Sequence, residues 1–130
     1  MESSSGSTQP EEFRLVLSPD LRAGWRARRA LRQRFSYRLP ARTLTDLISV
    51  VTELVNNAVA HGPGMPITVT LVVGSETIRG EVADRGNPAA AIPQIESADG
   101  RGLKLVDKLT SRWAVYEGST HVWFELPVDL

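Results

Sequence analysis

The chain has 130 residues, of which 42% are hydrophobic and 23% are charged, and it contains no cysteine. This size and composition are typical of one globular domain, and the lack of cysteine excludes disulfides, thiolate metal sites and cysteine nucleophiles. Fifteen Lys and Arg residues balance fifteen Asp and Glu residues, so the chain lacks the excess positive charge of a general nucleic-acid binder.

The charged residues are unevenly distributed along the chain. Residues 21–42 carry eight arginines and no acidic side chain, whereas residues 43–130 carry six basic and eleven acidic side chains. No apolar run approaches the ~20 residues of a membrane span, and the polar N-terminus is unlike a signal peptide. Because the absence of cysteine also suits a reducing compartment, we expect a cytoplasmic protein without membrane association.

The N-terminal part predicts a polar leader, a strand and a first helix. Residues 1–12 are expected to be disordered, with one domain over residues 13–130. Residues 13–17 predict a strand, and a serine cap followed by proline predicts a helix over residues 18–37. The inward stripe of that helix is expected to contain Leu21, Gly24, Trp25, Leu31 and Phe35.

A second helix is predicted from Thr43 to His61. Its apolar residues recur at helical spacing and form a broad face that is expected to pack against the core. These residues are Leu47, Ile48, Val51, Leu54, Val55, Ala58 and Val59. Gly62 is expected to end the helix in the left-handed conformation, and Pro63 prevents its continuation.

The remaining elements alternate between strands and one more helix. We expect strands at residues 66–74, 77–83, 112–116 and 122–126, a loop over 87–99, and a helix that begins near Gly102 with Leu103, Val106 and Leu109 inward. Strands joined by tight turns, with the helices grouped apart, predict an α+β two-layer sandwich.

Three polar clusters point to chemistry, and the first lies on the second helix. Glu53, Asn57 and His61 are spaced four residues apart, so they form one polar strip along it. An amide oxygen can bind Mg²⁺, and a neighbouring carboxylate can deprotonate a hydroxyl group. The alternative is a solvated face of an amphipathic helix.

The other two clusters lie at the ends of predicted elements. Asp84 and Gly86 end a strand, where a carboxylate can accept a hydrogen bond from an exocyclic amine and the glycine leaves room for a flat ring. Gly100, Arg101 and Gly102 precede a helix, where converging backbone N–H groups form a phosphate site. An ordinary turn and a flexible loop are the respective alternatives.

The order of these clusters resembles the histidine-kinase-like ATPase superfamily, which has the Bergerat fold. ELVNNAVAHG at 53–62 is similar to its N box, DRG at 84–86 to its first glycine box, and GRGLKLVDKL at 100–109 to its second. The branch most similar is that of the anti-sigma-factor serine/threonine kinases. The resemblance implies a mixed, mainly antiparallel sheet with about three helices on one face.

The resemblance also implies roles for individual residues. Glu53 matches the general base, Asn57 the Mg²⁺ ligand, and Asp84 the carboxylate that recognises adenine, with Gly86 under the ring. The family's segment that binds the phosphates of ATP matches Gly100, Arg101, Gly102 and Leu103. In this chain the lid at residues 87–99 is short and contains no lysine, which weakens the expectation of efficient catalysis more than that of nucleotide binding.

The basic first helix is a separate feature. Arg22, Arg26 and Arg29 cluster on one face of the predicted helix, which is either a solvated surface or a docking surface for an acidic partner or a second copy. In the anti-sigma branch this region takes part in dimerisation and sigma-factor binding.

The resemblance therefore implies an ATP- and Mg²⁺-dependent protein serine/threonine kinase. The resemblance implies that it phosphorylates an antagonist protein and regulates transcription through partner binding, with a sigma factor as a second partner and a homodimer as an open option. No direct contact with nucleic acid is expected. Two alternatives remain: a regulatory module that responds to ATP or ADP without transferring phosphate, and a structural domain with a degenerate site.

Overall fold

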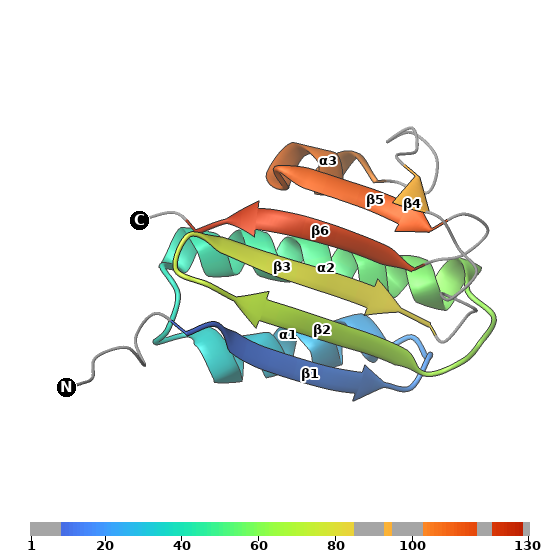
Figure 1. Ribbon diagram of the computed structural model, residues 1–130. Coiled ribbons are helices and arrows are strands. Elements are labelled where there is room, and N and C mark those ends of the chain that lie inside the picture. The colour runs from blue at the N-terminus through green and yellow to red at the C-terminus, as the bar shows by residue number, and fades with distance from the viewer. Residues whose placement is uncertain (1–8, 85–92, 95–102, 117–120, 129–130) are drawn as a thin grey trace.

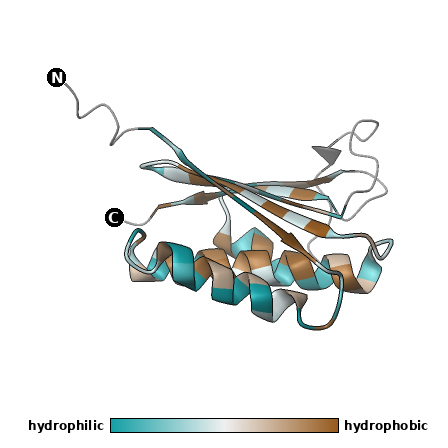
Figure 2. Cartoon of the chain, turned by 90° about the horizontal axis from the view of Figure 1, so that it is seen from below, coloured by the Kyte–Doolittle hydropathy of each residue, from teal (hydrophilic) through white to brown (hydrophobic). Residues whose placement is uncertain are grey.

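A computed structural model describes residues 9–84, 93–94, 103–116 and 121–128. Within these ranges six strands form one sheet, and helices cover one of its faces (Figures 1 and 2). The strands are β1 (Glu11–Leu17), β2 (Ile67–Val73), β3 (Thr77–Ala83), β4 (Pro93–Gln94), β5 (Arg112–Tyr116) and β6 (Val122–Pro127). The helices are α1 (Ala23–Phe35), α2 (Ala41–His61) and α3 (Lys104–Leu109).

The sheet has the strand order β1-β2-β3-β6-β5-β4. Every described strand pairing is antiparallel, so the described sheet is antiparallel rather than mixed. The prediction of an α+β two-layer sandwich is confirmed. None of the described helices is both long and apolar enough to cross a lipid bilayer.

Strand β1 begins earlier than the hydrophobic pattern predicts. Glu11 and Glu12, which the sequence assigns to the leader, already pair with β2. The carboxylate of Glu11 accepts a hydrogen bond from Arg34 Nε at 2.8 Å and forms an ion pair with Arg38 Nη2 at 2.7 Å. These two charges, from α1 and the segment after it, therefore hold the start of β1 against the helix layer.

Helix α1 begins five residues later than predicted. The backbone N–H groups at its start donate hydrogen bonds to Asp20 rather than to Ser18. The backbone N–H of Arg22 donates to Asp20 Oδ1 at 2.8 Å, and that of Ala23 donates to the Asp20 carbonyl oxygen at 3.0 Å. Arg26 adds a side-chain hydrogen bond to the same carboxylate at 3.0 Å. The N-cap of α1 is Arg22, without a side-chain cap hydrogen bond, so the predicted cap at Ser18 is wrong by four residues.

The buried face of α1 also differs from the prediction. Its buried residues are Ala23, Gly24, Ala27, Leu31 and Phe35. Leu21 and Trp25 are instead 95% and 51% exposed, so their assignment to the core is wrong. A methyl group on Gly24 would lie 2.6 Å from Asn56 Oδ1 of α2. The helices approach closely through small residues, which leaves no room between them for a tryptophan.

Helix α2 confirms the predicted second helix and its apolar face. Leu47, Ile48, Val51, Leu54, Val55 and Ala58 are buried, as is Val50, whereas Val59 is half-buried. The predicted left-handed conformation of Gly62 is wrong, because its φ of −83° and ψ of 178° are extended. Gly64, two residues later, has the positive φ of 80°.

The strands and the last helix follow the prediction closely. Strand β3 has the predicted bounds, and Val106 of α3 is buried while Leu109 is half-buried. In the predicted loop over residues 87–99, the part that the structure describes is β4, which pairs with the end of β5. Phe124 of β6 lies over Gly80 of β3 at the centre of the core.

Candidate functional site

The polar strip on α2 lies at the border of the core. Glu53 and Asn57 are half-buried, whereas His61 in the last turn is exposed. Leu54 and Ala58, the next residues along the helix, are buried. The helix therefore holds one carboxylate and one amide a single turn apart, where they are only partly hydrated.

The side chain of Asn57 carries a buried nitrogen atom. Its Nδ2 is buried, and within the described part of the chain it has no hydrogen-bond partner. A buried donor without a partner costs about 1–3 kcal/mol, so a ligand that accepts from it would recover this energy. A phosphate oxygen fits the nitrogen, and a hard cation such as Mg²⁺ fits the amide oxygen.

Asp84 follows β3 directly and is buried, with 1% of its surface exposed. Ile78, Gly80 and Val82 of the same strand are also buried, so Asp84 continues the alternation that points toward the helix layer. A carboxylate here lies at the edge of the core rather than on a solvated turn, which argues against the alternative of ordinary turn chemistry.

The end of α2 meets the end of β3 at Asp84. A Cβ atom placed on Gly62 would lie 2.6 Å from Asp84 Oδ2. Gly62, which directly follows the first predicted cluster, therefore lies against Asp84 of the second cluster, although the two residues are more than twenty positions apart in the sequence. Gly62 was predicted to end the helix and is the last residue of the segment that resembles the N box. Its contact with Asp84 was missed, because a glycine alone does not indicate which side chain approaches it.

The third cluster is described in part. Leu103, 1% exposed, immediately precedes α3, and α3 packs against α2. Gly86, Gly100, Arg101 and Gly102 lie outside the described residues. The structure therefore gives the position of the helix that follows the predicted phosphate segment, while the roles of the glycines and of the arginine remain predictions.

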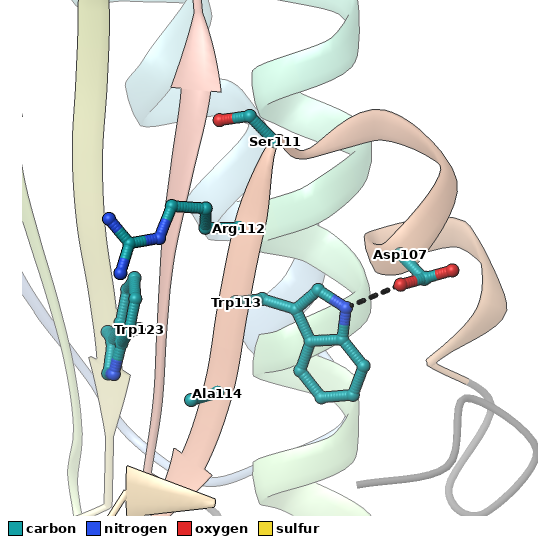
Figure 3. A pocket seen from close by; sticks show the side chains of 6 residues that line it. All are labelled: Asp107, Ser111, Arg112, Trp113, Ala114 and Trp123. Carbon is teal, nitrogen blue, oxygen red and sulfur yellow. Dashed lines mark hydrogen bonds between the residues drawn. The ribbon is translucent and has the colours of Figure 1, made fainter. Parts of the chain in front are cut away.

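A hydrogen bond fastens α3 to the sheet. Trp113 Nε1 of β5 donates to Asp107 Oδ1 of α3 at 2.9 Å (Figure 3). Because Trp113 is 6% exposed, its indole is fixed by packing, and the bond fixes α3 relative to β5. The sequence gives no signal for this pair, because its two residues belong to different elements.

A cavity of about 250 Å³ lies beside this pair. Its lining residues are Asp107, Ser111, Arg112, Trp113, Ala114 and Trp123 (Figure 3). Among the predicted site residues that the structure describes, which are Glu53, Asn57, Asp84 and Leu103, none lines this cavity. Among the described residues, no group of three or more His, Cys, Asp or Glu side chains is arranged to hold a metal ion.

Comparisons with known proteins agree with the fold. The sequence pattern of the histidine kinase-like ATPase domain matches residues 17–126. Twelve chains of known structure match. One is the crystal structure of the RsbU and RsbW domains of Rv1364c from Mycobacterium tuberculosis, with a TM-score of 0.67 and 22% sequence identity over 92% of this chain. The chain spans 32% of that longer protein chain. No curated protein matches.

Proposed function

The chain belongs to the histidine kinase-like ATPase domain family, and we propose that it binds ATP with Mg²⁺ and phosphorylates a serine or threonine of an antagonist protein. The observation that carries this proposal is the meeting of α2, which bears Glu53 and Asn57, with the buried carboxylate of Asp84. Each of these groups matches one requirement of a nucleotide site.

Asp84 is proposed to recognise the adenine base. A buried carboxylate accepts a hydrogen bond from an exocyclic amine more strongly than an exposed one, because water competes less for it. Gly86 is proposed to lie under the ring.

Asn57 is proposed to face the metal and the phosphates. Its amide oxygen suits Mg²⁺ as a hard ligand, and its unpartnered Nδ2 can donate to a phosphate oxygen. Bound Mg²⁺ would neutralise charge on the phosphates. Gly100, Arg101, Gly102 and Leu103 are proposed to bind the same phosphates through backbone N–H groups and the arginine side chain.

Glu53 is proposed as the general base. It lies one helical turn before Asn57, so both side chains project from the same side of α2. Its carboxylate takes the proton of the acceptor hydroxyl while that oxygen bonds to the γ-phosphorus and ADP leaves.

The outer surface of α1 is proposed to bind the protein partner. Trp25 is half exposed, and the guanidinium of Arg29 lies 5.4 Å from the centre of its ring. A cavity of about 380 Å³ beside them is lined by Trp25, Arg28, Arg29, Arg32 and Gln33. An exposed tryptophan among arginines suits an acidic partner, because aromatic and arginine side chains are frequent energetic centres of interfaces.

Transfer from labelled ATP to candidate antagonist proteins tests the proposal. We expect Asn57→Ala and Glu53→Gln to abolish phosphorylation, and Asn56→Ala, the exposed neighbour, to retain it as a matched control. Equal phosphorylation by Glu53→Gln would refute its role as the base. Tight binding of Mg-ATP in calorimetry without transfer to any antagonist would favour the alternative of a nucleotide-responsive regulatory module.

A further inference from the structure

Gly62 occupies a position where the backbone does not require glycine. Its φ of −83° and ψ of 178° are accessible to any residue. Its backbone N–H donates to the carbonyl oxygen of Ala58 at 2.9 Å, which closes the last turn of α2. The reason for a glycine must therefore lie in what surrounds it.

The surroundings leave no space for a side chain. A Cβ atom on Gly62 would contact the carbonyl oxygen of Ala58 and lie 2.6 Å from Asp84 Oδ2. Gly64, in the same connection, shows the opposite combination: its φ is 80°, and nothing lies within 4 Å of the Cβ position. One glycine is thus needed for close approach and the other for its backbone conformation.

The close approach determines where the carboxylate of Asp84 lies. Asp84 is 1% exposed, so its side chain cannot turn into solvent without disturbing the packing around it. The hydrogen bond to Ala58 keeps Gly62 at the end of α2. The Asp84 carboxylate therefore packs against the backbone at the end of α2, which restricts its position.

We infer that Gly62 is a positioning residue for base selection, because its missing side chain allows the Asp84 carboxylate to rest against α2 and face the exocyclic amine of the base. This inference rests on the proposed function. A methyl group at this position would meet both the Ala58 carbonyl oxygen at the end of α2 and the Asp84 carboxylate. The affinity for a ligand without the amine separates an effect on base selection from a general shift of α2.

The test compares two ligands on the full chain. Calorimetry with Mg-ATP and with the purine riboside triphosphate, which lacks the 6-amino group, measures the preference for the amine. We expect Gly62→Ala to bind Mg-ATP about tenfold more weakly, the effect of losing one hydrogen bond to a charged group. The affinity for the analogue should stay unchanged, so the preference disappears.

Gly64→Ala is the matched control. It introduces the same methyl group two residues away, in open space but at a strained backbone angle. It should lower the stability of the fold while the preference for ATP stays intact. An equal loss of affinity for both ligands in Gly62→Ala, or a fully retained preference, would overturn the inference.

Two further results keep the inference separate from the proposed function. If the unaltered chain binds neither ligand, the proposed function itself fails. If Gly62→Ala does not fold, amide NMR spectra of Asp84→Asn answer the question. The inference requires the Gly62 amide resonance to shift more than those of Gly64 and Gly74, and an unshifted Gly62 resonance overturns it.

Discussion

Replacing Gly80 by alanine tests how tightly β3 and β6 pack. The added Cβ would meet Phe124 Cζ and would lie 2.6 Å from Phe124 Cε1 and 2.9 Å from Leu71 Cδ2. Phe124 and Leu71 are both fully buried, so neither can move into solvent. The methyl group must therefore push apart the centre of the sheet and its side-chain layer.

The expected cost follows from this geometry. Adding a methyl group to a filled core costs about 1–3 kcal/mol, and the reduced freedom of the unfolded chain returns about 0.4–1 kcal/mol. We expect Gly80→Ala to lose about 1–2 kcal/mol, which lowers the melting temperature by about 4–8 °C for a domain of this size.

Gly24→Ala is the matched control for this prediction. Its added Cβ would lie 2.6 Å from Asn56 Oδ1, the end of an exposed side chain that can rotate away. Because alanine favours a helix over glycine by about 1 kcal/mol, this variant should be as stable as the unaltered chain or more stable.

Urea unfolding followed by far-UV circular dichroism measures both variants. Phe124→Leu in the Gly80→Ala background should recover part of the loss, because it vacates the space that the methyl group needs. The packing argument is refuted if Gly80→Ala is as stable as the unaltered chain, or if the two alanine variants change stability equally.

Three further predictions concern polar groups. The hydrogen bond from Arg26 lowers the pKa of the Asp20 carboxyl group. The stabilisation that Asp20 contributes is therefore fully present well above the ordinary pKa of an aspartate and is lost as the pH falls through the lowered pKa. The difference in stability between the unaltered chain and Asp20→Asn should close in urea titrations at acid pH. Trp113→Phe should destabilise the fold by about 1 kcal/mol, and Asp107→Ala should add little in that background, as a double-mutant cycle would measure. Without nucleotide, Asn57→Ala should raise or preserve the melting temperature, because it removes the Nδ2 atom that has no partner among the described residues. The variant should lose the stabilisation by Mg-ATP, which is about 2.7 kcal/mol for a ligand at 100 times Kd. A lower melting temperature of the variant without ligand would contradict this prediction.

The order and type of most elements could be predicted from hydrophobic spacing. Helix α2 and strand β3 have strong periods of 3.6 and 2 residues, and the structure places them within two residues of the expected bounds. In helix α1, hydrophobic spacing alone predicts the wrong buried face. Trp25 adds strongly to an apolar stripe, but small residues determine the buried face because they allow α1 to approach α2. Hydrophobicity alone does not predict that preference.

The candidate site could be predicted to a different extent in each cluster. Spacing was enough to place Glu53 and Asn57 on one strip, since that depends only on helical geometry. The burial of Asp84 and its contact with Gly62 depend on how α2 packs against β3, and no local pattern contains that information. A left-handed stop was expected at Gly62 because glycine often ends helices in that way. The packed structure shows that space was the stronger constraint.

The formal net charge is zero, but the chain has two distinct surfaces, the basic helix α1 and the site proposed for ATP, and both involve α2. Asn56 of α2 is the side chain nearest to the Cβ position of Gly24 in α1, while the next residue, Asn57, lies on the polar strip proposed for ATP. Helix α2 thus contacts the basic helix and carries, on the adjacent residue, a group proposed for nucleotide binding. If nucleotide binding shifts α2, the packing of α1 must change with it. Nucleotide binding then changes the affinity of α1 for an acidic partner by some factor, and linkage requires the bound partner to change the affinity for the nucleotide by that same factor. Comparing the affinity for Mg-ATP with and without a bound partner measures that factor, and a ratio of one would show that the two surfaces are independent.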